Sequence, residues 1–167
     1  MDQNFETSAS QGVHAQLGKL AGEWEGLASI WFEPGDPVDQ SPVHATMRPI
    51  LDGRFILHEY KGSFGGKALE GMALIGCHLE TGKYQMAWVD SFHTGTAMMF
   101  SESSRHAERL NVLGGYEYVT PEIDQTWGWR TEIELVHDDE LVLTAYNVTP
   151  EGEEAKATQT VYKRMMR

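Results

Sequence analysis

The chain has 167 residues and a formal net charge of −12, with 41% hydrophobic and 23% charged residues. This length suits one domain, and the hydrophobic fraction is too high for an intrinsically disordered chain. The excess of carboxylates repels phosphate backbones and anionic lipids, which argues against a nucleic-acid or membrane partner. We therefore expect a flexible leader over residues 1–11, which are small and polar, followed by one folded domain over 12–167.

The N-terminus and the cysteine content indicate the compartment. The first residues show neither a basic start nor an apolar segment, and no apolar run reaches the length of a membrane span. Cys77 is the only cysteine, so an internal disulfide is impossible, and its place in the apolar run 72–79 predicts a buried, unreactive thiol. These features predict a cytoplasmic protein.

The first predicted element is a short helix, and strands follow it. Val13, Leu17 and Leu20 are spaced as on one helical face, and the pattern stops at Gly22. From Trp24 onward, β-branched and aromatic runs alternate with Gly, Pro, Asp and Asn. These runs predict strands near 24–32, 43–49, 54–63, 67–78, 84–90, 96–101, 108–113, 115–120, 126–137, 141–149 and 155–165.

Consecutive strands with short turns and no second helical block favour antiparallel pairing between neighbours in the chain. A sheet of about ten such strands loses its exposed edges when it closes on itself. The predicted fold is therefore an all-β, antiparallel up-and-down barrel of about ten strands, capped by the short N-terminal helix.

The strand predicted at 126–137 indicates which side chains face inward. Its apolar and charged residues alternate with a period of two, as on a half-buried strand. The inward set on this strand is Trp127, Trp129, Thr131, Ile133, Leu135 and His137.

Two turns predict the register of the middle strands. Gly65-Gly66 is typical of a two-residue hairpin turn, and Gly82 suits the left-handed position of a four-residue loop. Both turns give the same inward set: Ile56, His58, Tyr60, Gly71, Ala73, Ile75, Cys77, Met86, Trp88 and Asp90. A bulged three-residue turn before Lys83 would instead turn Met72 and Leu74 inward, so the register of 67–78 stays open.

His58, Tyr60 and Asp90 are polar side chains on an otherwise apolar inner wall. Buried polar groups need partners, so one interpretation is a hydrogen-bonded cluster that fixes the strand register. A second is a pocket in which a few polar groups orient a small ligand. A third interpretation is catalytic: His58 or Asp90 accepts a proton, and Tyr60 donates a hydrogen bond to the negative charge that develops during the reaction.

The sequence lacks the usual signatures of metal and phosphate sites. The seven histidines, at positions 14, 44, 58, 78, 93, 106 and 137, do not have the spacing of metal ligands. The glycines around Gly65 precede no helix, so they form no phosphate-binding loop. We expect no metal and no other cofactor.

The two ends of the chain resemble those of lipocalin-like barrels. Gly22-Glu23-Trp24 is similar to the Gly-x-Trp signature of lipocalins, and Thr160 to Arg164 resembles the closing strand of fatty-acid-binding proteins. This resemblance implies that Arg164 stacks on Trp24 where the barrel closes. The same start is similar to that of nitrobindin-like haem barrels, for which only His137 could supply the proximal ligand.

A longer pattern resembles the bacterial domain-of-unknown-function family 1579. The matching residues are Leu51 to Phe55, Glu59-Tyr60, Gly62, Gly71-Met72, Leu74 to Gly76, Thr81, Lys83-Tyr84, Trp88, Asp90, Thr94-Gly95, Pro150, Gly152, Glu154, Tyr162 and Arg164. The family usually has Tyr-Asp where this chain has Cys77-His78. The resemblance implies a calycin/lipocalin-like β-barrel and no particular activity.

These features together lead us to expect a barrel that binds a small, largely apolar molecule in its interior. The candidate ligand-binding residues are His58, Tyr60, Trp88, Asp90, Trp127 and Trp129, of which the last two could stack on a flat ligand, and the candidate closure residues are Trp24 and Arg164.

Two alternatives to simple ligand binding stay open. One is an enzyme of the isomerase or lyase type that uses the inward His, Tyr and Asp. The other is a solid barrel that forms a homodimer or an interaction module through the outward apolar residues Phe55, Leu57 and Val89. The volume enclosed by the barrel discriminates between a hollow and a solid interior.

Overall fold

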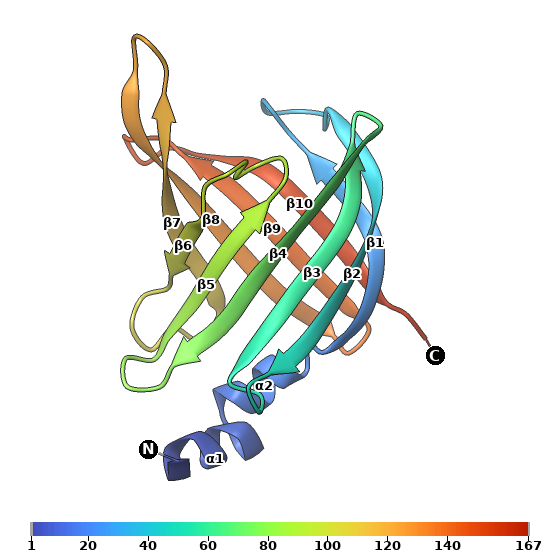
Figure 1. Ribbon diagram of the computed structural model, residues 1–167, viewed down its shortest axis with the longest axis vertical. Helices are drawn as coiled ribbons and strands as arrows, with labels where there is room; N and C mark the ends of the chain where they lie inside the picture. The colour runs from blue at the N-terminus through green and yellow to red at the C-terminus, as the bar shows by residue number, and fades with distance from the viewer. Residues whose placement is uncertain (1, 167) are drawn as a thin grey trace.

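Within residues 2–166, which the computed structural model describes, ten strands pair in chain order and close into a barrel (Figure 1). The strands are β1 (Gly22–Ile30), β2 (Asp39–Ile50), β3 (Phe55–Phe64), β4 (Lys67–His78), β5 (Lys83–Asp90), β6 (Met99–Glu102), β7 (Leu110–Val119), β8 (Asp124–His137), β9 (Glu140–Val148) and β10 (Glu154–Arg164). Antiparallel pairing of β1 with β10 closes the sheet. The predicted up-and-down barrel is therefore confirmed.

Two short helices, α1 (Asp2–Gln11) and α2 (Val13–Gly18), lie at one end of the barrel (Figure 1). Leu17 on α2 and Leu20 just after it are buried in the barrel core, so this end is capped as the spacing predicted. Neither helix has the length or the apolar character needed to cross a bilayer.

Helix α1 occupies the residues for which we expected a flexible leader. Its Phe5 ring packs edge-on against His14, at 5.1 Å between centroids, and the Arg54 guanidinium lies 4.2 Å from the same ring. Ser8 Oγ and His14 Nδ1 are 2.8 Å apart. These tertiary contacts hold a segment whose own sequence lacks an apolar helical face.

Strand β7 runs through Gly114, which we expected to separate two strands. A Cβ at Gly114 would lie 2.3 Å from Ser101 Oγ and 2.8 Å from the Phe100 carbonyl oxygen. Glycine therefore allows β6 and β7 to approach closely, and it does not end the strand.

The two hairpin turns set the register of β3, β4 and β5. Gly65 and Gly66 have φ of 55° and 79°, the left-handed pair that a type I′ turn requires. Gly82 has φ 63°, and Ala73 of β4 pairs with Trp88 of β5. The four-residue loop is therefore confirmed, and the bulged alternative is excluded. Every member of the inward set predicted for β3 to β5 is buried or half-buried.

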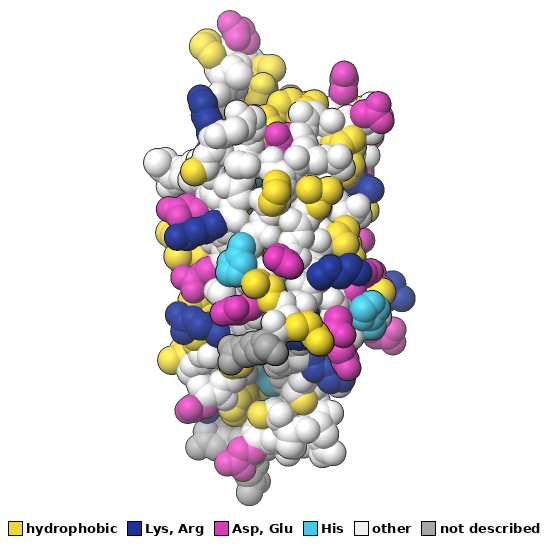
Figure 2. All heavy atoms as spheres, turned by 90° about the vertical axis from the view of Figure 1, so that its right-hand side faces the viewer, with side chains coloured by type: hydrophobic (Ala, Val, Ile, Leu, Met, Phe, Trp, Pro, Cys, Tyr) yellow, Lys and Arg dark blue, Asp and Glu magenta, His cyan; other side chains and the backbone are white. Residues whose placement is uncertain are grey.

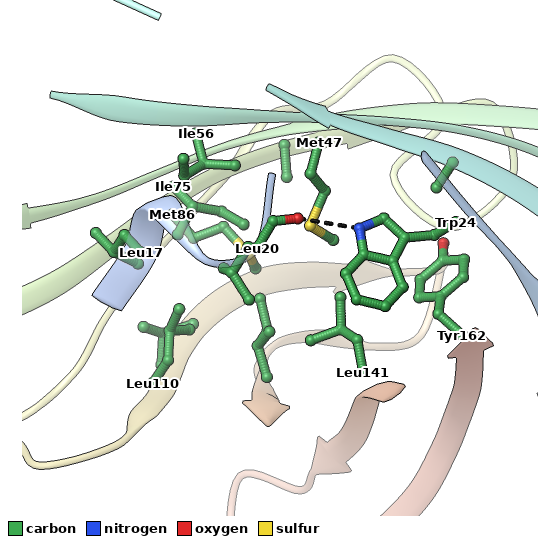
Figure 3. Packing of buried hydrophobic residues seen from close by; sticks show 14 of the residues in the cluster. Leu17, Leu20, Trp24, Met47, Ile56, Ile75, Met86, Leu110, Leu141 and Tyr162 are labelled. Atoms are coloured by element: carbon green, nitrogen blue, oxygen red, sulfur yellow. Dashed lines mark hydrogen bonds between the residues drawn. The ribbon is translucent and has the colours of Figure 1, made fainter. Parts of the chain in front are cut away.

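Large apolar side chains fill the end of the barrel next to α2 (Figure 3). The labelled members of this core are Leu17, Leu20, Trp24, Met47, Ile56, Ile75, Met86, Leu110, Leu141 and Tyr162. The Trp24 indole N–H donates a hydrogen bond of 3.0 Å to the Leu20 carbonyl, which ties the helical cap to β1.

Arg164 at the end of β10 lies over Trp24, with the guanidinium carbon 4.2 Å from the ring centroid. The guanidinium also donates hydrogen bonds to the carbonyls of Ala21 and Lys19 ahead of β1, and to that of Asp138 in the β8–β9 turn. One side chain thus ties both ends of the sheet together. This is the arrangement that the resemblance to lipocalin-like barrels implies.

The outer surface mixes apolar and charged side chains. On the face shown in Figure 2, isolated apolar groups lie between Lys, Arg, Asp and Glu side chains of both signs. Phe55, Leu57 and Val89, the outward residues considered for an interface, are each half-buried.

Replacing Arg164 by Ala should lower the free energy of unfolding by roughly 2 kcal/mol, because the stacking and the carbonyl hydrogen bonds are lost together. Arg164→Lys should recover less than half of this, since an ammonium cannot reproduce the planar fork. Urea denaturation measures both effects. The control is Lys163→Ala, next in the chain and exposed, which should cost under about 0.5 kcal/mol. Equal losses at both positions would contradict the closure role.

Candidate functional site

A cavity of about 100 Å³ lies inside the barrel, toward the end at which β3 turns into β4. Six aromatic or imidazole rings contribute to its wall: His58, Tyr60, Trp88, His93, Trp129 and Tyr162. The remaining wall consists largely of aliphatic and small side chains, such as Met86, Ala73 and Ala145. The interior is therefore not solid.

The size of this cavity limits what it can hold. Pockets for drug-sized ligands typically measure about 300–1,000 Å³, whereas an apolar cavity of about 150 Å³ binds benzene. At about 100 Å³, the cavity suits a molecule of the size of a single aromatic ring. The rest of the interior is filled by the core next to α2.

Asp90, the last residue of β5, organises the polar side of the cavity, and its side chain is 1% exposed. Oδ2 accepts hydrogen bonds of 2.8 Å from the Tyr60 hydroxyl and 2.8 Å from His93 Nδ1. Oδ1 accepts from the backbone N–H groups of Phe92 (2.9 Å), His93 and Thr94 (3.3 Å). One carboxylate therefore holds the cavity wall and the start of the β5–β6 loop together.

The protonation of this cluster follows from its contacts. Burial alone would raise the pKa of the Asp90 carboxyl, but hydrogen bonds from His93 and Tyr60 outweigh it and hold this pKa below its ordinary value. Burial and the Asp90 charge raise the pKa of Tyr60. Because an ionised carboxylate can only accept, the bridging hydrogens belong to the Tyr60 hydroxyl and to His93 Nδ1.

The Tyr60 hydroxyl makes two hydrogen bonds within the protein. It accepts a 2.8 Å hydrogen bond from the Trp88 indole N–H and donates its own hydrogen to Asp90. This hydrogen is not available to a bound molecule, contrary to the interpretation of Tyr60 as a donor to developing charge. The hydrogen-bonded cluster of Tyr60, Trp88, Asp90 and His93 is therefore part of the cavity wall.

His93 also lines the cavity. Its Nε2 is buried and has no hydrogen-bond partner within residues 2–166. The ring centroid lies 5.6 Å from that of Trp88 and 5.5 Å from that of Trp129, and the two indoles stack at 5.4 Å. A buried nitrogen without a partner costs free energy, and the protein surrounds this atom closely enough to exclude water.

His58 also contributes to the wall. Its Nε2 lies 3.3 Å from the Tyr162 hydroxyl, and burial lowers the pKa of the imidazole to about 4. His58 is therefore neutral at pH 7, with Nε2 committed to Tyr162.

The structure brings five of the six predicted ligand-binding residues to one cavity, and these are His58, Tyr60, Trp88, Asp90 and Trp129. Trp127 does not line it. That residue pairs with Tyr116 on the β7–β8 hairpin, which extends past the neighbouring strands in Figure 1.

Sequence reasoning missed His93, because the period-two alternation of β5 stops at Asp90. The available signal was an Asp at a strand end before a loop, since such a side chain often accepts hydrogen bonds from the backbone two or three residues on.

Two other residues lie differently from their predicted places. His137 is exposed, because the register shifts between Leu135 and His137, and it lies near α2, far along the barrel from the cavity. It therefore cannot serve as a haem ligand inside the barrel. Cys77 is half-buried instead of buried, and burial raises the pKa of its thiol.

The next feature considered is a metal site. Among residues 2–166, no group of three or more His, Cys, Asp or Glu side chains is arranged to hold a metal ion.

His58 should make stability pH-dependent. Its pKa is about 4 in the folded protein against an ordinary 6.5, so the unfolded chain binds the proton more readily. This stability is fully present above pH 6.5 and is lost as the pH falls, by roughly 3 kcal/mol at pH 4. Denaturation of the wild type and of His58→Gln across this range measures it. An unchanged difference between the two proteins from pH 7 to pH 4 would contradict a neutral buried imidazole.

Tyr60→Phe should lower the free energy of unfolding by roughly 2–3 kcal/mol, because it leaves the Trp88 N–H without a partner and removes one donor from Asp90. Urea denaturation followed by tryptophan fluorescence measures the loss. The matched control is Tyr118→Phe, at an exposed position, where the change should be under about 0.5 kcal/mol. A small effect at Tyr60 would show that the cluster does not hold the wall.

Comparison with known proteins identifies the family. The chain matches the family described as a protein of unknown function (DUF1579) over residues 9–164, and it belongs to that family. The resemblance seen in the sequence is thereby confirmed. No curated protein matches the sequence.

Two solved structures resemble the chain to different degrees. The S-type phycobiliprotein lyase CPES from Guillardia theta matches with a TM-score of 0.56 and 11% identity, over 97% of each chain. A protein of unknown function from the DUF3598 family of Nostoc punctiforme gives a TM-score of 0.39 and 14% identity, over 88% of this chain and 48% of its own. The likeness to the lyase shows a shared calycin-like barrel fold.

Proposed function

We propose that this member of the DUF1579 family binds a small, largely apolar molecule in the cavity of its barrel. The observation that carries the proposal is the composition of the wall, where aromatic and aliphatic side chains, with a few Ser and Thr residues among them, surround a space of about 100 Å³. A mostly apolar lining with a few placed polar groups is typical of small-molecule sites.

The rigidity of the wall supports the same proposal. Asp90 fixes Tyr60 and His93, and Tyr60 in turn fixes the Trp88 indole, all through bonds within the protein. A wall held in this way loses little conformational entropy when a molecule binds, which favours affinity for even a small ligand.

The fold is compatible with an interior site. The lyase from Guillardia theta, a protein that acts on phycobiliproteins by its title, has the same barrel. We further propose a cytoplasmic location for the protein, which suits its one free thiol, Cys77.

Filling the cavity should abolish binding. Ala145 is buried and lines the cavity, so Ala145→Leu places extra carbon atoms in the space, whereas Ala87→Leu makes the same change on the outer face. With toluene as the probe, the indole signals of Trp88 and Trp129 should shift in NMR spectra of the wild type and of Ala87→Leu. Ala145→Leu should bind toluene at least about tenfold more weakly.

The proposal fails if toluene leaves the wild-type indole signals unchanged, or if Ala145→Leu and Ala87→Leu respond alike. Thermal denaturation of both variants checks that each is folded at the temperature of the titration.

A further inference from the structure

We infer that the ligand is a small, uncharged aromatic molecule with a hydrogen-bond acceptor, and that the N–H at His58 Nδ1 donates to this acceptor. The inference rests on the proposed function and deepens it, because it names the ligand class and the atom that recognises it.

The first step concerns the place of His58 Nδ1. The residue lines the cavity and is only 4% exposed, and its other ring nitrogen, Nε2, faces the Tyr162 hydroxyl. Within residues 2–166, Nδ1 has no hydrogen-bond partner, yet it is not one of the fully enclosed atoms that lack one, which are His93 Nε2, Ser101 Oγ and Trp127 Nε1. Open space therefore remains beside Nδ1, and for a side chain buried this deeply that space is the cavity.

The second step concerns the hydrogen of this imidazole. His58 is neutral, so one of its two nitrogens carries a hydrogen and the other has a lone pair. If Nε2 carried the hydrogen, the Tyr162 O–H would find no acceptor in the described part of the chain, and Nδ1 would lack a partner as well. If Tyr162 instead donates to Nε2, only the N–H at Nδ1 is left over. The second arrangement leaves fewer buried groups unpaired and is the more stable one.

The aromatic side of the wall uses its other donors within the protein. The Tyr60 hydroxyl and His93 Nδ1 both donate to Asp90, and the Trp88 indole N–H donates to Tyr60. The N–H at His58 Nδ1 is therefore the donor that this side of the wall offers to a ligand.

Hydroxyl groups form another part of the wall. The residues that carry them are Ser29, Ser63, Thr131, Thr144, Thr158 and Thr160. Two of these hydroxyls already accept hydrogen bonds, Ser29 from Gln40 and Thr144 from Gln159. A hydroxyl can donate or accept and rotates to suit its partner, so this group tolerates either kind of polar atom on a ligand. The N–H of His58, which Tyr162 fixes, tolerates only an acceptor.

The shape and charge of the cavity define the rest of the ligand. The indoles of Trp88 and Trp129 stack at 5.4 Å between centroids, and both line the space, which favours a planar aromatic occupant. Among residues 2–166, no Lys or Arg lines the cavity. An anionic ligand would meet no cation and would lie near the Asp90 carboxylate, so the occupant is uncharged.

The His58 ring is held in place before a ligand arrives. Its centroid lies 5.1 Å from that of Tyr60 and 6.0 Å from that of Tyr162, which it meets edge-on. Together with the 3.3 Å contact from Nε2 to the Tyr162 hydroxyl, these rings set the direction in which Nδ1 points.

4-Methylpyridine and toluene test the inference, because they share a shape and differ in one ring nitrogen, which is an acceptor. At pH 8 both probes are uncharged. The ratio of their dissociation constants should favour 4-methylpyridine about tenfold more in the wild type than in His58→Leu, as measured by NMR titration. Toluene makes no hydrogen bond in either protein, so it corrects for the altered shape of the wall.

The outcomes of this titration separate the two proposals. If toluene binds the wild type and the ratio is the same in His58→Leu, the inference is wrong and the proposed function stands. If neither probe binds the wild type, both are wrong. The matched control is His44→Leu on the outer face of β2, which should keep the wild-type ratio.

Thr131→Val tests the hydroxyls as the rival recognition group, because it removes a hydroxyl from the wall and keeps the side-chain shape. A preference for 4-methylpyridine that falls in Thr131→Val and survives in His58→Leu would overturn the assignment of His58 Nδ1.

Nitrogen-15 NMR of the wild type tests the same assignment without any substitution. In the free protein, Nδ1 of His58 should carry the hydrogen, and the signal of this N–H should shift more with 4-methylpyridine than with toluene. A hydrogen on Nε2, or an Nδ1 signal that responds equally to both probes, would contradict the inference.

Discussion

The contact between β1 and β10 is the constraint on which the rest of the molecule depends. Arg164 stacks on Trp24 and binds backbone carbonyls on both sides of the closure. A closed sheet has no free edge, and its interior must be filled from every strand. The end next to α2 is filled by a large apolar core, and the space of about 100 Å³ lies in the other part of the interior.

Asp90 gives that space its chemical character. A buried carboxylate needs several hydrogen bonds, and the ones it receives come from Tyr60, His93 and the backbone of the β5–β6 loop. Satisfying Asp90 uses the Tyr60 hydroxyl and His93 Nδ1. The same hydrogen bonds hold the Tyr60 and His93 rings in place, so one electrostatic requirement produces the rigidity of this part of the wall.

Sequence alone predicted the barrel and most of the wall, and of two possible middle registers it favoured the observed one, because these depend on local signals. Gly82 needs a positive φ, and period-two alternation then carries the register from that turn to Trp88. His93 was not predicted as a wall residue, because its position depends on how the loop after β5 folds around Asp90. His137 was wrongly predicted to face inward because the strand register shifts after Leu135. No residue type in this part of the sequence predicts that irregularity. Helix α1 depends on tertiary contacts that a local pattern does not contain.

The central claim, an open and apolar ligand space in the barrel, is tested most directly by a crystal structure under xenon pressure. Xenon binds dry apolar cavities and avoids sites occupied by ordered water. The account predicts one xenon atom between Met86, Trp88 and Trp129, on the His93 side of the core. A cavity without xenon, filled instead by side chains or by ordered water, would contradict it.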